Sequence, residues 1–448
     1  MEQDENKIVD QLQDLMSRAK AAGADAADAI YVQGTSLSVS QRLGEPEHLE
    51  RAEGYDLGLR VLIGKRQAIV SSSDTSAEAV DELLERAVAM AKVVPEDEFC
   101  GLAPEDLLAG DTPDLDECDD TEPDADALTA MAKAAEQAAM AVEGVSNSEG
   151  AEASWGRTFV ALAATNGFAR ARVRTGSSIS AAVLAGTGTA MERDYDWASA
   201  VYLADLPDPA EIGRRAGEQA VRRLNPRKAE TAQVPVIYDP RVSQSLPAHL
   251  AGAINGSAVA RGTTFLKDKM GEQVMAAGIT IIDDPLRRRG LRSKGFDAEG
   301  IATTRRALIE NGVLKTWVLD LRSARQLGLQ STGSASRGTS SPPSPSTTNL
   351  HIEAGTISRD DLLKGVESGF YVTEMMGRGI SMVTGDYSRG ATGFWIENGA
   401  IADPVSEVTI AGNLKTMFME MTPADDLVFR YGTNAPTLRV DGMTVAGK

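Results

Sequence analysis

Residues 384–415 read TGDYSRGATGFWIENGAIADPVSEVTIAGNLK, and this stretch decides the fold of the C-terminal half. The run at 394–396 favours a strand, and the Asn398-Gly399 pair that follows tolerates the positive φ of a tight hairpin turn. A second strand is expected over 405–410 and a short helix over 414–418. The stretch therefore predicts a β-hairpin that leads into a helix.

A glycine-flanked loop before this hairpin is expected to lie at a functional site or an interface. Between Gly385 and Gly390 it carries a carboxylate, a phenol, a hydroxyl and a guanidinium, and binding residues are often found on such loops. A solvated turn is the alternative interpretation. Two glycine-rich segments, 376–390, which contains this loop, and 331–340, provide the candidate substrate- or partner-binding residues: Arg378, Asp386, Tyr387, Ser388, Arg389, Ser331, Thr332 and Gly333.

The glycine-rich segments 376–390 and 331–340 suggest a mode of binding. Their backbone groups would be free to pair with an extended peptide, as in strand addition. Arg378 and Arg389 would then meet a peptide carboxylate. The alternative is that both segments are surface turns.

Bulk composition limits the classes of function. The chain has 448 residues, of which 42% are hydrophobic and 25% charged, so two or three domains are expected. A formal net charge of −20 repels phosphate backbones, so nucleic acid is not an expected partner. No apolar run approaches the roughly eighteen residues of a membrane span, and the acidic start MEQDENKIVD lacks the features of a secretory signal. Cys100 and Cys118 fit neither a redox nor a zinc spacing, so we expect a cytoplasmic protein.

The spacing of apolar and polar residues along the chain predicts an α+β protein of several domains. An N-terminal α+β domain is expected over 1–95 and an acidic linker over 96–125. A middle antiparallel β-meander with flanking helices should follow over 126–228, and a mixed β-rich C-terminal domain with helices over 233–448. The acidic linker lacks the carboxylate spacing of a calcium loop, so we interpret it as an extended strap over the surface.

Residues 331–348 read STGSASRGTSSPPSPSTT. This composition is low in complexity and has no apolar anchor after residue 333, so the segment is expected to be mobile and easily cut by proteases. A place near a peptide-binding cleft and simple disorder are both compatible with it.

Residues for autonomous catalysis are scarce. The chain has three histidines, His48, His249 and His351, and none has a second histidine within a helical turn or two. No HExxH zinc helix and no GxSxG elbow can be built, and Ser388 has no histidine near it in the sequence. Residues 442–448 match a phosphate loop only in their spacing, because the following Ser or Thr is missing.

Several stretches resemble the TldD–PmbA family of bacterial peptidase subunits, and within it the PmbA (TldE) branch. The resemblance is dense from about residue 234 to 411 and collinear, though weaker, across the N-terminal half. Besides the hairpin stretch it rests on RGTTFLKDKMGEQV (261–274), FDAEGIATTRRALIENGVLKTWVLDLRSARQLGLQSTG (296–333) and VTEMMGRGIS (372–381).

The resemblance implies that the metal site of the TldD branch is missing here. That branch has a His-Glu-x-x-x-His motif at the start of a helix and a ligating cysteine near the C-terminus. Anchored on RGT at 261–263, the motif falls on residues 247–252, so both histidine positions are lost, to Pro247 and Gly252, and the glutamate position is Ala248. His249 lies one step out of register. No cysteine follows Cys118.

By this resemblance the chain is a metal-free subunit that holds no cofactor of its own. It would form a heterodimer with a TldD-like chain carrying zinc or iron, and a possible homodimer when alone. The complex would process small or unfolded peptides, including peptide-antibiotic precursors and antitoxins, and family members bear the label modulator of DNA gyrase. Proteolysis is expected only with the partner present.

Two alternatives remain open at this point. One is an autonomous metallopeptidase with atypical ligands, such as His249 with Asp239, Asp283 or Asp284. The other is a peptide-binding protein without enzymatic activity. The acidic charge disfavours direct binding of gyrase or nucleic acid.

Overall fold

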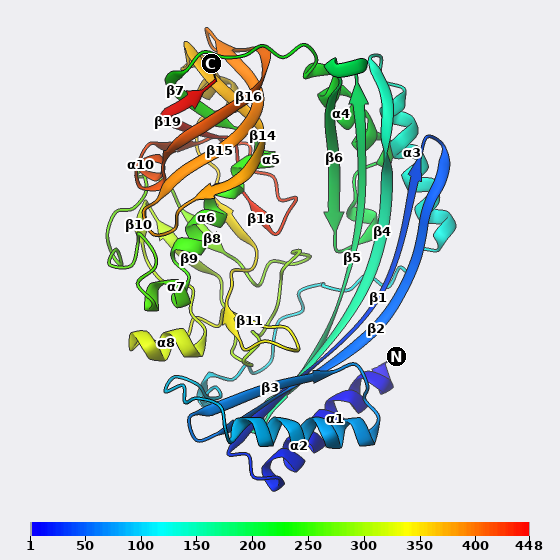
Figure 1. Ribbon diagram of the computed structural model, residues 1–448, viewed down its shortest axis with the longest axis vertical. Helices are drawn as coiled ribbons and strands as arrows, with labels where there is room; N and C mark the ends of the chain where they lie inside the picture. Colours follow the sequence, from blue (N-terminus) through cyan, green and yellow to red (C-terminus); the bar gives the residue numbers. More distant parts are fainter. Residues whose placement is uncertain (1, 448) are drawn as a thin grey trace.

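A computed structural model describes residues 2–447 of the chain. A long curved antiparallel sheet and a C-terminal body face each other and touch near both ends (Figure 1). The sheet has the order β3-β2-β1-β4-β5-β6. Its strands are β1 (Ala26–Arg42), β2 (Glu45–Ile63), β3 (Arg66–Ser72), β4 (Val145–Ala164), β5 (Ala169–Ala185) and β6 (Glu192–Ala200).

This sheet is shared by the first and middle predicted domains. Strand β1, from the first, pairs with β4, from the middle, in unbroken register from Asp28–Ala164 to Gln41–Ala151. Helices α1 (Glu2–Ala21) and α2 (Ala77–Ala91) pack on one end, and α3 (Ala125–Met140) and α4 (Pro209–Arg222) on the other. Two apolar clusters, one under each helix pair, stabilise the two ends.

The C-terminal body contains two further sheets. The larger has the order β16-β15-β14-β7-β19-β17 and the other β10-β9-β8-β13-β18. The larger sheet is built from β7 (Ala232–Tyr238), β14 (Ser368–Ile380), β15 (Asp386–Glu397), β16 (Ala400–Asn413), β17 (Met421–Pro423) and β19 (Leu438–Ala446). The smaller is built from β8 (Ile281–Asp283), β9 (Arg306–Glu310), β10 (Val313–Leu314), β13 (Leu350–Ile352) and β18 (Thr433–Asn434).

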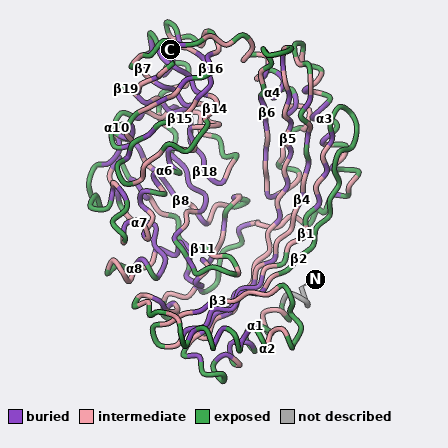
Figure 2. Tube along the Cα trace, viewed as in Figure 1, coloured by how far each residue is buried: buried purple, intermediate pink, exposed green. Residues whose placement is uncertain are grey.

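Short helices and one small hairpin complete this body. They are α5 (Pro240–Ser243), α6 (Ser245–Ala253), α7 (Gly256–Ala260), α8 (Leu321–Leu327), α9 (Arg359–Lys364), α10 (Leu414–Met419), β11 (Ala335–Ser336) and β12 (Ser344–Pro345). Short 3-10 turns lie at Glu105–Leu107, Gly188–Ala190 and Leu203–Asp205. Most of these elements share one large apolar core, and α9 packs with the larger sheet in a separate, smaller cluster (Figure 2). The predicted α+β class is thus confirmed.

The hairpin that opened the sequence analysis is confirmed. Strands β15 and β16 pair around Asn398 and Gly399, whose φ angles are 48° and 79°. The helix after them is capped by the Asn413 side chain, which accepts a hydrogen bond from the Lys415 amide. The β-prone run at 427–431 forms no strand and lies between β17 and β18.

The acidic linker has no helix or strand before α3 apart from the 3-10 turn at Glu105–Leu107. It is bound to the C-terminal body by arginines. Arg325 donates to the carbonyl oxygens of Phe99 and Leu102 at 3.0 and 2.7 Å. Arg322 donates to Asp97 at 2.7 Å. Because the linker has no Lys or Arg of its own, it does not repel these arginines of the C-terminal body.

The segment 331–348 is not the contact-free loop that its composition predicts. It contains the β11–β12 hairpin, which packs onto the long sheet. Arg337, whose side chain is 0% exposed, forms an ion pair with Asp28 of β1, and Thr339 bonds to Asp56 of β2. Asp28 also bonds to Arg60. Burial alone would raise the pKa of Asp28, but the charges of Arg337 and Arg60 lower it overall.

Among the described residues, no helix combines the length and apolar character needed to cross a bilayer.

Candidate functional site

The predicted loop residues 386–389 lie on a strand instead of a loop. They form the start of β15, where successive side chains point to opposite faces. Asp386 and Ser388 are exposed, whereas Tyr387 is 2% exposed and points into the core. The Tyr238 hydroxyl donates to the Tyr387 hydroxyl at 3.4 Å, and burial raises the pKa of Tyr387. Tyr387 is therefore a packing residue.

Strand pairing brings Arg378 close to the outward-facing residues of β15. Gly379 of β14 is the partner of Ser388, and Met376 is the partner of Gly390, with a bulge between. Arg378 sits in that bulge and is exposed. The Nε of Arg389 donates to the carbonyl oxygen of Met376 at 3.1 Å. The exposed end of the β14–β15 pair thus presents the guanidinium of Arg378 with a carboxylate and a hydroxyl of β15, whereas Arg389 is half-buried on the face of Tyr387.

Residues 331–333 do not join this group. The Thr332 hydroxyl accepts from the Leu319 amide at 2.8 Å, and the Ser331 hydroxyl donates to the Leu319 carbonyl at 3.3 Å. Gly333 has a φ of 64°, and a Cβ there would lie 2.6 Å from the Ala302 carbonyl oxygen. These residues fix the base of the β11–β12 hairpin, which Figure 1 places at the far end of the body from β15.

The positions aligned with the metal motif lie on helix α6. Pro247 is buried, Ala248 and Gly252 are exposed, and none has a side chain able to bind a metal. His249 is the remaining imidazole, and its Nε2 is buried without a hydrogen-bond partner among the described residues. Burial, with a smaller effect from the charge of Arg389, lowers its pKa to about 4.

A metal does not fit this helix. The His249 ring packs edge-on against Tyr387 with centroids 6.0 Å apart, and the nearby charge of Arg389 would repel a cation. Within residues 2–447, no three or more His, Cys, Asp and Glu side chains are grouped so that they could hold a metal ion. Of the other two histidines, His48 is exposed on β2, and His351 is buried on β13 against Phe429.

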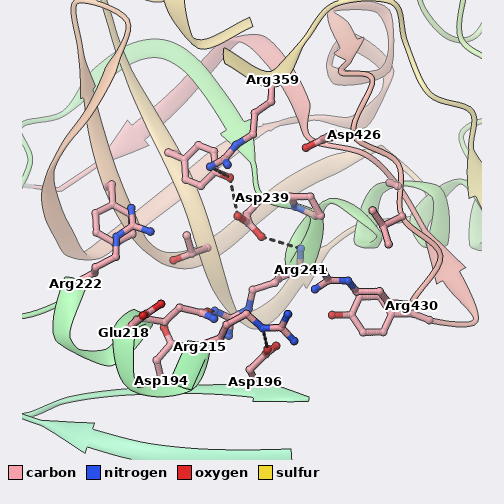
Figure 3. A pocket seen from close by; sticks show the side chains of 18 of the residues that line it. Asp194, Asp196, Arg215, Glu218, Arg222, Asp239, Arg241, Arg359, Asp426 and Arg430 are labelled. Carbon is pink, nitrogen blue, oxygen red and sulfur yellow. Dashed lines mark hydrogen bonds and ion pairs between the residues drawn. The ribbon is translucent and has the colours of Figure 1, made fainter. Parts of the chain in front are cut away.

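The structure reveals a second candidate that sequence reasoning missed. A cavity of about 510 Å³ lies between the middle domain and the C-terminal body (Figure 3). Its walls come from β6, α4, α5, β14, β15, α9 and the segment after β17. Its charged lining consists of five arginines and five carboxylates: Arg215, Arg222, Arg241, Arg359, Arg430, Asp194, Asp196, Glu218, Asp239 and Asp426.

Every carboxylate of this cavity has a partner. Asp196 accepts from Arg215 at 2.6 Å, and Asp194 accepts from Arg241 at 2.8 Å. Burial alone would lower the pKa of Arg241, but the charge and hydrogen bond of Asp194 raise it overall. The three other carboxylates are bound by Tyr371 (Asp239, 2.6 Å), Thr437 (Asp426, 2.7 Å) and Arg214 (Glu218).

Comparison with known proteins identifies relatives along the whole chain. Models of the PmbA/TldA metallopeptidase family match in three parts: domain 1 at 27–91, the central domain at 118–224 and the C-terminal domain at 231–447. The Metalloprotease PmbA of Escherichia coli O157:H7 is 36% identical over 99% of this chain and 97% of its own. A Metalloprotease PmbA homolog of Haemophilus influenzae is 37% identical over 96% and 94%.

A solved structure has the same fold. A putative modulator of DNA gyrase from Bacteroides thetaiotaomicron superposes with a TM-score of 0.92 at 28% identity, covering all of both chains.

Proposed function

Because the chain belongs to the TldD–PmbA family, as a PmbA-like member, we propose that it is the metal-free subunit of a two-chain peptidase. Its partner is a TldD-like chain that carries the zinc or iron. This chain supplies part of the wall of the chamber and guides the peptide. Catalysis belongs to the partner, so none of the residues described above is assigned a catalytic role.

The observation that carries the proposal is the chemistry of helix α6. A proline, an alanine and a glycine stand where the resemblance puts two ligands and a general base. A peptidase needs a metal-bound water or an activated nucleophile, and these side chains offer neither. The name metalloprotease, which the relatives bear, would then describe a complex in which the partner holds the metal.

The substrates of such a complex are small or unfolded peptides, including peptide-antibiotic precursors and antitoxins, processed in the cytoplasm. Without its partner the chain would form a homodimer. The name modulator of DNA gyrase, carried by the Bacteroides relative, would then reflect an indirect effect of proteolysis. Direct contact with nucleic acid is disfavoured by the net charge of −20.

The autonomous metallopeptidase is the weaker candidate, because its carboxylates are occupied. Asp239 caps α5 and accepts from the Tyr371 hydroxyl. Asp283 accepts two hydrogen bonds from Thr348, both at 2.7 Å, in a buried site. Using either as a ligand to a metal on His249 would require these contacts to break.

Affinity capture from the native cytoplasm tests the proposal directly. The tagged chain should retain a TldD-like chain, and elemental analysis should find no stoichiometric zinc or iron on the chain purified alone. The two-chain complex should cleave peptide, and the single chain should not. About one metal ion per isolated chain, retained after mild chelation, would support the autonomous enzyme instead.

Variants of the exposed end of β14–β15 test the guiding role. Asp386→Ala with Arg389→Ala should reduce cleavage by the complex, because both side chains project from β15. Tyr387 is left intact because its burial would confuse loss of function with loss of folding. His249→Ala is the control and should leave cleavage nearly unchanged, whereas the autonomous enzyme predicts that it abolishes activity.

A further inference from the structure

The interdomain cavity has a mismatch between its cations and its anions. All five carboxylates are engaged, as described above, but not all the arginines are. Arg222 and Arg430 have no ion pair or side-chain hydrogen bond to any described residue, and no dashed line reaches either guanidinium in Figure 3. The chain has 65 acidic and 45 basic residues, so an arginine without a carboxylate partner is unexpected where carboxylates are so close.

A third arginine carries an unused donor inside the wall. Arg359 donates through Nη2 to the Tyr371 hydroxyl at 2.9 Å, but its Nε is buried and has no partner within the described residues. A buried donor left unsatisfied costs about 1–3 kcal/mol. This nitrogen lies inside the wall, where a ligand in the cavity does not reach it.

Arg222 is held in a pose suited to binding. Its guanidinium lies over the Phe394 ring, 4.8 Å from the centroid. Stacking of this kind fixes the plane of the guanidinium and leaves the N–H groups at its edge free. Arg222 and Arg430 are both exposed at the cavity, so a ligand can reach them without displacing a protein partner.

The remaining lining favours a monoanion with an apolar part. Two parallel hydrogen bonds from a guanidinium match a carboxylate well. A dianion such as phosphate would be repelled more strongly by the five carboxylates already present. The Phe394 ring and the side chain of Val428, which is 56% exposed, provide apolar surface in the same cavity. Its volume lies within the roughly 300–1,000 Å³ typical of small-ligand sites.

We propose that this cavity binds the carboxylate of a short peptide at the guanidinium of Arg222, which the Phe394 ring orients, while Arg430 adds a second unpaired positive charge to the same cavity. The carboxylate is either the C-terminus of the peptide or an acidic side chain. The site is separate from the β14–β15 residues considered above. The identification of the ligand as a peptide rests on the proposed function, whereas the preference for a carboxylate rests on the cavity alone.

Calorimetric titration of the purified full chain tests this. The probes are the acetylated tripeptide Ala-Leu-Val with a free C-terminus, the same peptide as its C-terminal amide, and the amide of Ala-Glu-Val. The free acid should bind at least about tenfold more tightly than the uncharged amide, as expected for loss of a charge-assisted contact. Tight binding of the Glu-containing amide would identify a side-chain carboxylate as the source.

Three variants assign the effect to the cavity. Arg222→Gln with Arg430→Gln should weaken binding of the free acid at least about tenfold. Arg359→Lys, which keeps the charge and changes only donors inside the wall, should leave binding unchanged in a folded variant. Arg86→Gln, an exposed arginine on α2, is the control and should bind as the unmodified chain does. Circular dichroism checks that each variant is folded.

Two results would overturn the proposal: equal binding of free acid and amide, or no saturable binding of the free acid at millimolar concentration. A chain that fails to capture a TldD-like partner but binds the free acid would refute the proposed subunit role and leave the carboxylate site standing. Capture of the partner without carboxylate binding would support the proposed subunit role and refute the carboxylate site.

Discussion

The long sheet meets the C-terminal body in two places, and arginine is used differently in each. At the lower contact the β11–β12 hairpin brings Arg337 onto Asp28, which also binds Arg60, and all three side chains are 5% exposed or less. At the upper contact the cavity keeps Arg222 and Arg430 exposed and without a carboxylate. The lower contact is dry and closed, and the upper one is open.

The difference follows from the cost of removing charge from water. A guanidinium without water must have a counter-charge, because an isolated buried ion costs several kcal/mol. Arg337 and Arg60 therefore share one carboxylate, and their burial keeps a ligand from reaching them. At the open contact water satisfies the guanidinium groups at little cost, so they remain available. Both contacts hold the two parts together, the upper one through the ion pairs of Arg241 with Asp194 and of Arg223 with Glu374, but only the upper one also has exposed guanidinium groups left for a ligand.

The largest expected effect comes from breaking the closed contact. Asp28→Ala leaves Arg60 and Arg337 buried without a counter-charge, which should lower the free energy of unfolding by about 3–5 kcal/mol. Urea unfolding followed by circular dichroism measures this. Asp10→Ala, at an exposed position on α1, should stay within about 0.5 kcal/mol. An equal, small loss in both variants would mean that the Asp28 ion pairs do not hold the two parts together.

His249 extends the comparison to a buried group that has no counter-charge at all. Its pKa is lowered to about 4 from 6.5, so between these values the unfolded chain binds a proton that the folded chain does not. Stability should therefore fall as the pH drops from 6.5 to 4, by up to about 3 kcal/mol from this group.

The measurement is urea unfolding at several pH values in this window. His249→Gln should flatten the dependence, and His48→Gln, which removes an exposed imidazole, is the matched control. If the His249 variant and the unmodified chain lose stability in parallel, the group has a partner that the structure does not reveal.

A smaller effect is expected from crowding the closed contact. A Cβ at Gly58 of β2 would overlap the backbone carbonyl of Thr339 in the hairpin. Gly58→Ala should therefore displace the hairpin and destabilise the fold by about 1–3 kcal/mol. Limited proteolysis should then cut within 336–344 in the variant and spare that segment in the unmodified chain.

Gly34→Ala is the matched control for this test. Gly34 lies on the neighbouring strand β1, and nothing lies within 4 Å of a Cβ placed there. Cleavage of the hairpin at equal rates in all three proteins would show that it is not fixed on the sheet.

The smallest effect on stability should come from the open contact. Arg222→Gln loses the contact with the Phe394 ring, worth about 0.5–1 kcal/mol at an exposed site, and no ion pair with the described residues. Its thermal midpoint should stay close to that of the unmodified chain while carboxylate binding falls. A loss as large as that of Asp28→Ala would make Arg222 structural and remove the contrast between the two contacts.

Local turn chemistry was predictable from the sequence, but pairing across the chain was not. Asn398-Gly399 and Asn311-Gly312 encode positive φ, and both pairs sit at hairpin turns with φ angles near 48° and 79°. The interpretation of Tyr387 as a loop residue was wrong because its glycine neighbours suggest a loop. Pairing with β14 and β16 instead imposes strand alternation and turns its ring into the core.

The misjudged hairpin and the missed cavity have the same cause. Segment 331–348 looks free of anchors, but the partner of Arg337 is 309 residues away, and no local pattern reveals such a pair. The cavity is lined from seven parts of the chain, so its arginines are ordinary surface residues in the sequence. Only tertiary structure shows which of them lack a carboxylate.

The shared sheet determines how this protein can be divided. Residues 27–91 and 118–224 match separate family models, yet β1 and β4 are neighbours along fourteen register pairs. A fragment ending in the acidic linker would expose the whole inner edge of β1, and the complementary fragment the edge of β4. Bare edges of that length pair with other copies and aggregate. Truncation experiments should therefore keep residues 1–228 together, because the unit that can be expressed is the sheet and not the family domain.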